Sequence, residues 1–157
     1  MKLDLKYYPQ HTDYSCGPVC LRMVFEHLGR IYSEEKLIAL CKANKKEGTN
    51  HVPIKKEVEK EGFVYIEGTH GTIKYLINSI ESGYPVIINY IDPVSESGHY
   101  AIVIGYDKKD KIIIIADPCN GNDFSISWNE LKKRWHNQRN SSHGWFMIIG
   151  RESVNIK

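Results

Sequence analysis

The first half of the chain carries apolar residues at the spacing of amphipathic helices. Residues 19–28 are almost continuously apolar, which is typical of a helix buried on most of its sides, and Gly29 suits its C-terminal cap. Ser33 has the position of an N-cap before a second helix over residues 34–42. Two further helices and one short strand are expected, at residues 53–60, 73–80 and 63–66 respectively.

From Pro85 onward the pattern changes to strands. Apolar, β-branched runs predict strands on the interior of a sheet that is covered on both faces, at residues 86–90, 100–106 and 112–116. A short strand at 1–8, a short helix from a capping box at Ser127 to near Trp135, and a last strand at 145–149 are also expected. Helices followed by a hairpin-rich sheet predict an α+β fold, with the N-terminal helices packed on an antiparallel sheet.

Length and charge narrow the class of protein. A chain of 157 residues with 41% hydrophobic content is the right size for one domain, spanning residues 1–157. The net charge of +2 is near neutral, and lysines alternate with glutamates over residues 55–61, as on a solvated helix face. No nucleic acid partner is therefore expected.

The sequence also bears on compartment and metals. No secretion signal and no run of about 20 apolar residues is found, so we expect a cytoplasmic protein without a membrane span and with reduced cysteines. The four cysteines and seven histidines lack the short paired spacings of a zinc site, so neither a metal nor another cofactor is expected.

The residue type that points to chemistry is Cys16, in the segment Gln10-His11-Thr12-Asp13-Tyr14-Ser15-Cys16-Gly17-Pro18. The segment delivers the thiol to the predicted start of a helix, where unpaired N–H groups favour a thiolate. A small buried hydrophobe is the alternative role for a cysteine, and it is the role expected for Cys20, Cys41 and Cys119. A nucleophilic Cys16 needs a base and an orienting group.

His99 is the best-placed base among the seven histidines, because it begins a central strand. Asp117 ends the next, antiparallel strand, so the two side chains are expected to lie side by side, although a plain strand-ending turn would also explain Asp117. Gln10 could donate to an oxyanion together with the N–H of Cys16. The other histidines are less well placed: His27 is expected on the core helix, and loops or exposed runs are expected for His11, His51, His70, His136 and His143.

Taken together, these elements resemble the papain-like, bacteriocin-processing peptidases that cleave after double-glycine leaders. The match runs over nearly the whole chain and consists of Gln10, Cys16-Gly17-Pro18, His99-Tyr100 and Asp117-Pro118 in that order. The resemblance implies a papain-like fold with Cys16 as nucleophile, His99 as general base, Asp117 as orienting residue and Gln10 in the oxyanion hole. Ser15 precedes the cysteine where transporter-linked members carry aspartate, a form similar to the stand-alone members.

Three functions follow as hypotheses. The first is a cysteine peptidase acting on a peptide or protein substrate, with a transporter or secretion protein as the partner that the resemblance suggests. The second keeps the same triad in an acyl transferase or an amidase acting on a non-peptide amide. The third is a catalytically silent module that binds a peptide in the cleft.

Overall fold

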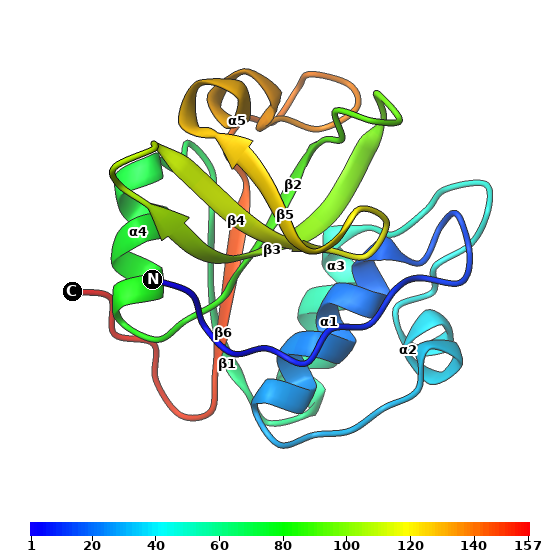
Figure 1. The fold of residues 1–157 in the computed structure, drawn as a ribbon. Helices are drawn as coiled ribbons and strands as arrows, with labels where there is room; N and C mark the ends of the chain where they lie inside the picture. Colours follow the sequence, from blue (N-terminus) through cyan, green and yellow to red (C-terminus); the bar gives the residue numbers. More distant parts are fainter.

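The computed structural model describes residues 1–157 and is an α+β structure with five helices and one six-stranded sheet (Figure 1). The helices are α1 (Cys16–His27), α2 (Glu34–Leu40), α3 (His51–Lys60), α4 (Ile73–Glu81) and α5 (Trp128–Arg134). The strands are β1 (Val64–Gly68), β2 (Val86–Ile91), β3 (Gly98–Asp107), β4 (Ile112–Asp117), β5 (Gly121–Ser127) and β6 (Phe146–Gly150). They are ordered β1-β6-β2-β3-β4-β5, and every neighbouring pair is antiparallel.

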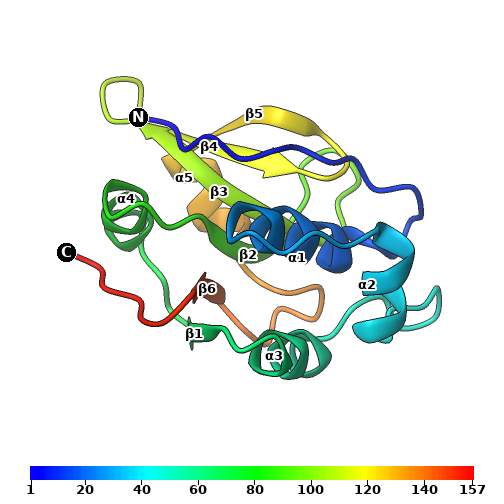
Figure 2. The ribbon, with the colours of Figure 1, turned by 90° about the horizontal axis from the view of Figure 1, so that it is seen from below.

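Both faces of the central strands are covered, as the doubly apolar runs predict. Along β3, Ile102 and Ile104 join the core beneath α1, α2 and α3, whereas Ala101 and Val103 join the core beneath α4 and α5. Successive side chains of a strand point to opposite faces, so one strand contributes to both cores. Figure 2 shows α1 lying against β3, and this packing sets the position of whatever stands at the start of α1.

The helix signals in the sequence are confirmed at their ends. Ser33 caps α2, its side chain accepting from the N–H of Lys36, and Ser127 caps α5 by accepting from the N–H of Glu130. Gly29 follows α1 with a φ of 90°, in the left-handed region that glycine adopts most easily.

One expected strand is absent and one observed strand was not expected. Residues 1–8 form no regular strand but only an isolated bridge between Lys2 and Gly105, after which they run back along the sheet toward α1 (Figure 2). Strand β5 was not expected, because it is an exposed edge strand in which only Ile126 is buried. An edge strand needs no continuous apolar pattern to pair with its neighbour.

None of the five helices combines the length and the apolar character needed to cross a membrane.

Candidate active site

Cys16 is the first residue of α1, as the sequence predicts. The N–H groups of a first helical turn have no acceptor within the helix, and Pro18, the third helical residue, carries no N–H at all. The thiol is half-buried, and its Sγ accepts a hydrogen bond from the backbone N–H of Tyr100 at 3.5 Å. The sulfur therefore lies where α1 meets strand β3.

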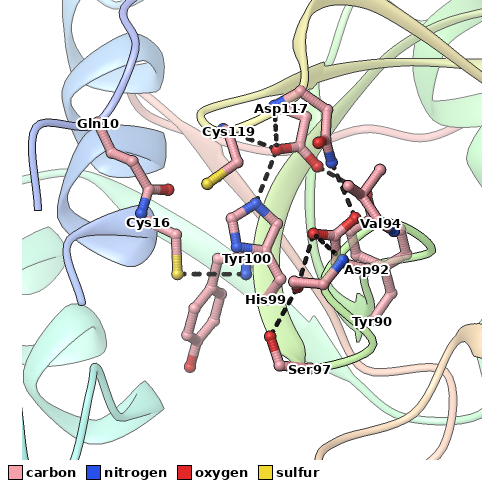
Figure 3. Close-up of polar contacts among 12 residues, drawn as sticks. Gln10, Cys16, Tyr90, Asp92, Val94, Ser97, His99, Tyr100, Asp117 and Cys119 are labelled. Atoms are coloured by element: carbon pink, nitrogen blue, oxygen red, sulfur yellow. Dashed lines mark hydrogen bonds and ion pairs between the residues drawn. The ribbon is translucent and has the colours of Figure 1, made fainter. Parts of the chain in front are cut away.

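His99 and Asp117 lie side by side on β3 and β4, which confirms the expectation from antiparallel pairing. Nε2 of His99 lies 2.7 Å from Oδ1 of Asp117, and both side chains are buried, that of Asp117 completely. Three more donors satisfy this carboxylate: the hydroxyl of Tyr90 at 2.6 Å and the backbone N–H groups of Cys119 at 2.8 Å and Asn120 at 3.1 Å. Figure 3 shows the second nitrogen of the His99 ring on the side of the Cys16 sulfur.

The electrostatics of the pair favour charged forms. Burial acts to lower the pKa of His99, but the hydrogen bond to Asp117 and the interaction with the Cys16 sulfur outweigh it and raise the pKa to about 11. Burial acts to raise the pKa of Asp117, and the contacts with His99 and Tyr90 hold it below its usual range. The arrangement therefore stabilises an imidazolium between the Asp117 carboxylate and the Cys16 sulfur.

Gln10 reaches the same site from the segment that precedes α1. Its Nε2 donates to the carbonyl oxygen of Thr12 at 2.7 Å, and Figure 3 shows the amide nitrogen on the side of Cys16. An amide nitrogen carries two hydrogens, so one remains for another acceptor. The backbone N–H of Gln10 donates to the carbonyl of Pro118 at 3.0 Å, which ties this segment to the turn after Asp117.

Two of the other three cysteines are buried as expected, and the third is not. Cys20 and Cys41 are buried, as predicted, and burial raises the pKa of the Cys41 thiol to about 12. Cys119 is exposed, so its expected burial is wrong. It lies in the tight turn between β4 and β5, where its backbone N–H donates to the Asp117 carboxylate and its side chain lies at the surface.

A cleft of about 500 Å³ opens beside the thiol. Residues 47–51 form part of its wall, residues 137–139 with Ser141 form another part, and Cys16 and Tyr100 also line it. The loop at Thr49 approaches the start of α1 closely, because a Cβ on Gly17 would stand 2.6 Å from the Thr49 methyl group. Gly98, the residue before His99, donates its N–H to the side-chain oxygen of Gln138, which belongs to the second of these wall segments.

His51 lines this cleft, although the sequence indicated only a loop or an exposed position. It is the first residue of α3, and its ring stacks on Trp145 with centroids 3.8 Å apart and an interplanar angle of 3°. Its Nδ1 pairs with the hydroxyl of Tyr100, and burial lowers its pKa to about 4. His27, expected on the core helix, does end α1, but it is exposed.

No group of three or more His, Cys, Asp or Glu side chains is arranged to hold a metal ion. The site brings together a thiol, an imidazole, a carboxylate and an amide.

Known proteins of similar structure include peptidases and peptidase domains. Among solved structures, the peptidase domain of Streptococcus ComA, a bi-functional ABC transporter, is similar with a TM-score of 0.74 and 27% identity over 92% of this chain and 97% of that one. A Bacillus anthracis protein described as a C39-like peptidase has a TM-score of 0.74 at 18% identity, covering 98% of this chain and all of that one. A double glycine motif protease from an AMS/PCAT transporter, solved with its leader peptide, has a TM-score of 0.68 at 18% identity over 94% and 92% of the chains.

These structures share the α+β architecture, so the expected papain-like peptidase fold is confirmed. The search of curated proteins gave no match. The sequence model of the Peptidase_C39 like family matches residues 2–143, which is most of the chain. The chain therefore belongs to the Peptidase_C39 like family.

Proposed function

We propose that this protein is a cysteine peptidase with Cys16 as its nucleophile. The observation that carries the proposal is the convergence of a half-buried thiol at a helix start with His99 and Asp117, whose side chains lie 2.7 Å apart. A nucleophile, a base within reach and a third group that orients the base are the parts that thiol catalysis requires.

Catalysis begins with attack of the Cys16 thiolate on the carbonyl carbon of the scissile peptide bond. The carbonyl π electrons move onto oxygen, and the resulting oxyanion accepts hydrogen bonds from the Cys16 N–H and from the free amide hydrogen of Gln10. His99, as imidazolium, gives its proton to the leaving nitrogen as the C–N bond breaks. The amine product departs and a thioester remains on Cys16.

Hydrolysis of the thioester uses the same groups in reverse. Neutral His99 takes a proton from water, whose oxygen attacks the thioester carbon, and the C–S bond then breaks to restore the thiolate and imidazolium. Asp117 keeps the imidazole ring in one orientation throughout and stabilises its positive charge. The two backbone N–H groups and the Tyr90 hydroxyl that bond Asp117 fix the carboxylate in turn.

We further propose that the substrate is a peptide with glycine at the two positions before the cut. The double glycine motif protease, solved with its leader peptide, supports this substrate class, and the ComA peptidase domain, part of an ABC transporter, supports a partner linked to export. The cleft beside Cys16, open to solvent and lined by two loops, is large enough for a short extended peptide.

The test compares wild type with Cys16→Ala on a synthetic peptide that carries Gly-Gly in its centre, read by mass spectrometry. We expect cleavage after the second glycine by wild type and none by the variant. Iodoacetamide at near-neutral pH should modify Cys16 before Cys119, and Cys119→Ala is the matched control that removes the other accessible thiol. Equal reactivity of the two thiols, together with no cleavage, would overturn the proposal.

Two added measurements separate the other two functions. If an added amine is joined to the acyl group faster than water, the protein is an acyl transferase with this triad. If Cys16→Ala retains full biological activity, the fold serves as a peptide-binding module.

A further inference from the structure

One buried carboxylate beside the site is not used by the proposed mechanism. Glu34, the first residue of α2, is 4% exposed. Its Oε1 accepts from the backbone N–H of His11 at 2.9 Å and from the hydroxyl of Ser15 at 2.6 Å, and its Oε2 lies 2.6 Å from Nδ1 of His11. Burial acts to raise the pKa of Glu34, but these contacts outweigh it and hold the pKa below its usual range.

The partners of Glu34 are next to the two proposed oxyanion donors. His11 follows Gln10 directly, and Ser15 directly precedes Cys16. One carboxylate on α2 therefore holds both ends of the loop that carries these donors. The Gln10 end is also held by the hydrogen bond from the Gln10 backbone N–H to the carbonyl oxygen of Pro118.

Ser15 precedes α1 directly but does not cap it with its side chain. A serine that precedes a helix ordinarily accepts a hydrogen bond from an N–H of the first turn. Ser15 makes no such bond with its side chain: its backbone (φ −99°, ψ 13°) is not in the extended conformation of an N-cap, Pro18 offers no N–H, and its hydroxyl is directed to Glu34. The N–H groups of Cys16 and Gly17 are thereby left free of a side-chain cap, which is the condition an oxyanion hole at this helix start requires.

We infer that Glu34 is a positioning residue: it holds the segment from Gln10 to Cys16 so that the Gln10 amide and the Cys16 N–H point at the same oxyanion. This inference rests on the proposed peptidase function and adds to it a residue from an element that does not touch the substrate. The sequence shows Glu34 only as an acidic residue in a first helical turn, a common feature without catalytic meaning.

The test uses Glu34→Ala, with Glu35→Ala as the matched control because Glu35 is the exposed neighbour on the same helix. On the Gly-Gly peptide we expect Glu34→Ala to lower kcat by roughly tenfold to a hundredfold, the cost of misplaced catalytic groups. KM and the rate of Cys16 alkylation by iodoacetamide should stay at control values, because neither depends on an oxyanion. The affinity for a peptide aldehyde, whose adduct with Cys16 places an oxygen in the oxyanion hole, should fall in parallel with kcat.

Glu34→Gln is measured beside Glu34→Ala and decides the matter if the alanine variant does not fold. Its amide oxygen can take the place of Oε1 and accept from both the His11 N–H and the Ser15 hydroxyl, while the negative charge is lost, so kcat should lie between those of wild type and the alanine variant. If the kcat of Glu34→Ala, or that of Glu34→Gln where the alanine variant does not fold, equals that of Glu35→Ala, the inference is overturned. A lower kcat accompanied by a higher KM and slower alkylation of Cys16 would also overturn it, since Glu34 would then only support the fold. A wild type that neither cleaves nor is alkylated at Cys16 would instead refute the peptidase proposal itself.

Discussion

The hydrogen bonds of Asp117 allow the orientation of the amide in Asp117→Asn to be predicted. Its Oδ1 accepts from His99 and from the backbone N–H groups of Cys119 and Asn120, whereas Oδ2 accepts only from the Tyr90 hydroxyl. In the variant, the amide oxygen must take the place of Oδ1, because an NH₂ group there would face three donors. The NH₂ group then faces the Tyr90 hydroxyl, which can rotate to accept.

His99 therefore keeps its hydrogen bond in Asp117→Asn and loses only the negative charge. A hydrogen bond to a charged group is worth about 1.5–3 kcal/mol and a neutral one about 0.5–1.5 kcal/mol, a difference of about 1–1.5 kcal/mol. This difference corresponds to a pKa of His99 lower by about one unit. It also corresponds to a rate lower by about tenfold.

The assay is kcat/KM against pH on the Gly-Gly peptide, because its alkaline limb follows the loss of the imidazolium in the free enzyme. The raised pKa of His99 puts this limb well above neutral pH in wild type, and Asp117→Asn should move it down by about one pH unit. Asp92→Asn is the control, since Asp92 is a buried carboxylate bonded to Asn120 and Ser95 rather than to His99. A limb that stays in place would refute the role of Asp117.

Asp117→Ala completes the series. It removes the acceptor and leaves the buried Tyr90 hydroxyl and two partly buried N–H groups without this partner, so activity and stability should both fall further than in Asp117→Asn. If the asparagine and alanine variants lose equal activity, the orientation deduced for the amide is wrong.

Three further outcomes are expected. Gln10→Ala should lower kcat by about a hundredfold while alkylation of Cys16 is unchanged, and an unchanged kcat would exclude Gln10 from the oxyanion hole. Folded His51 stays neutral down to pH about 4, whereas unfolded His51 binds a proton below about 6.5, so stability falls as pH falls through this range. His51→Gln should remove about 1–2 kcal/mol of that decline in urea unfolding at pH 7 and 4.5, allowing for partial exposure. Tyr90→Phe should cost about 1 kcal/mol of stability by the same method, through the lost bond to Asp117.

The parts of the site that could be predicted are those fixed by regular structure. The end of one strand and the start of its antiparallel neighbour must lie together, so the pairing of His99 with Asp117 follows from two apolar runs and the turn between them. The position of Cys16 follows in the same way from the apolar run behind it and from Pro18 in the first turn.

The parts that could not be predicted depend on contacts between distant segments. His51 is a single polar residue at a helix start, and its burial comes from Trp145 and Tyr100, which no local pattern connects to it. Glu34 has the sequence context of an ordinary helix-start acid, and only the folded loop brings His11 and Ser15 to it. Cys119 resembles a buried thiol in the sequence because the turn that exposes it depends on how Asp117 binds the chain after it.

The packing of α1 on β3 has a consequence for how this site can fail. The thiol belongs to a helix and the imidazole to a sheet, so their separation is set by the seam between two bodies and not by either alone. A substitution deep in that seam, far from any substrate, can slide the helix and uncouple sulfur from ring while both secondary structures stay intact. The hydrogen bond from the Gln10 N–H to the Pro118 carbonyl joins the segment before α1 to the turn after β4, and so is a second link between the helix side and the sheet side of the site.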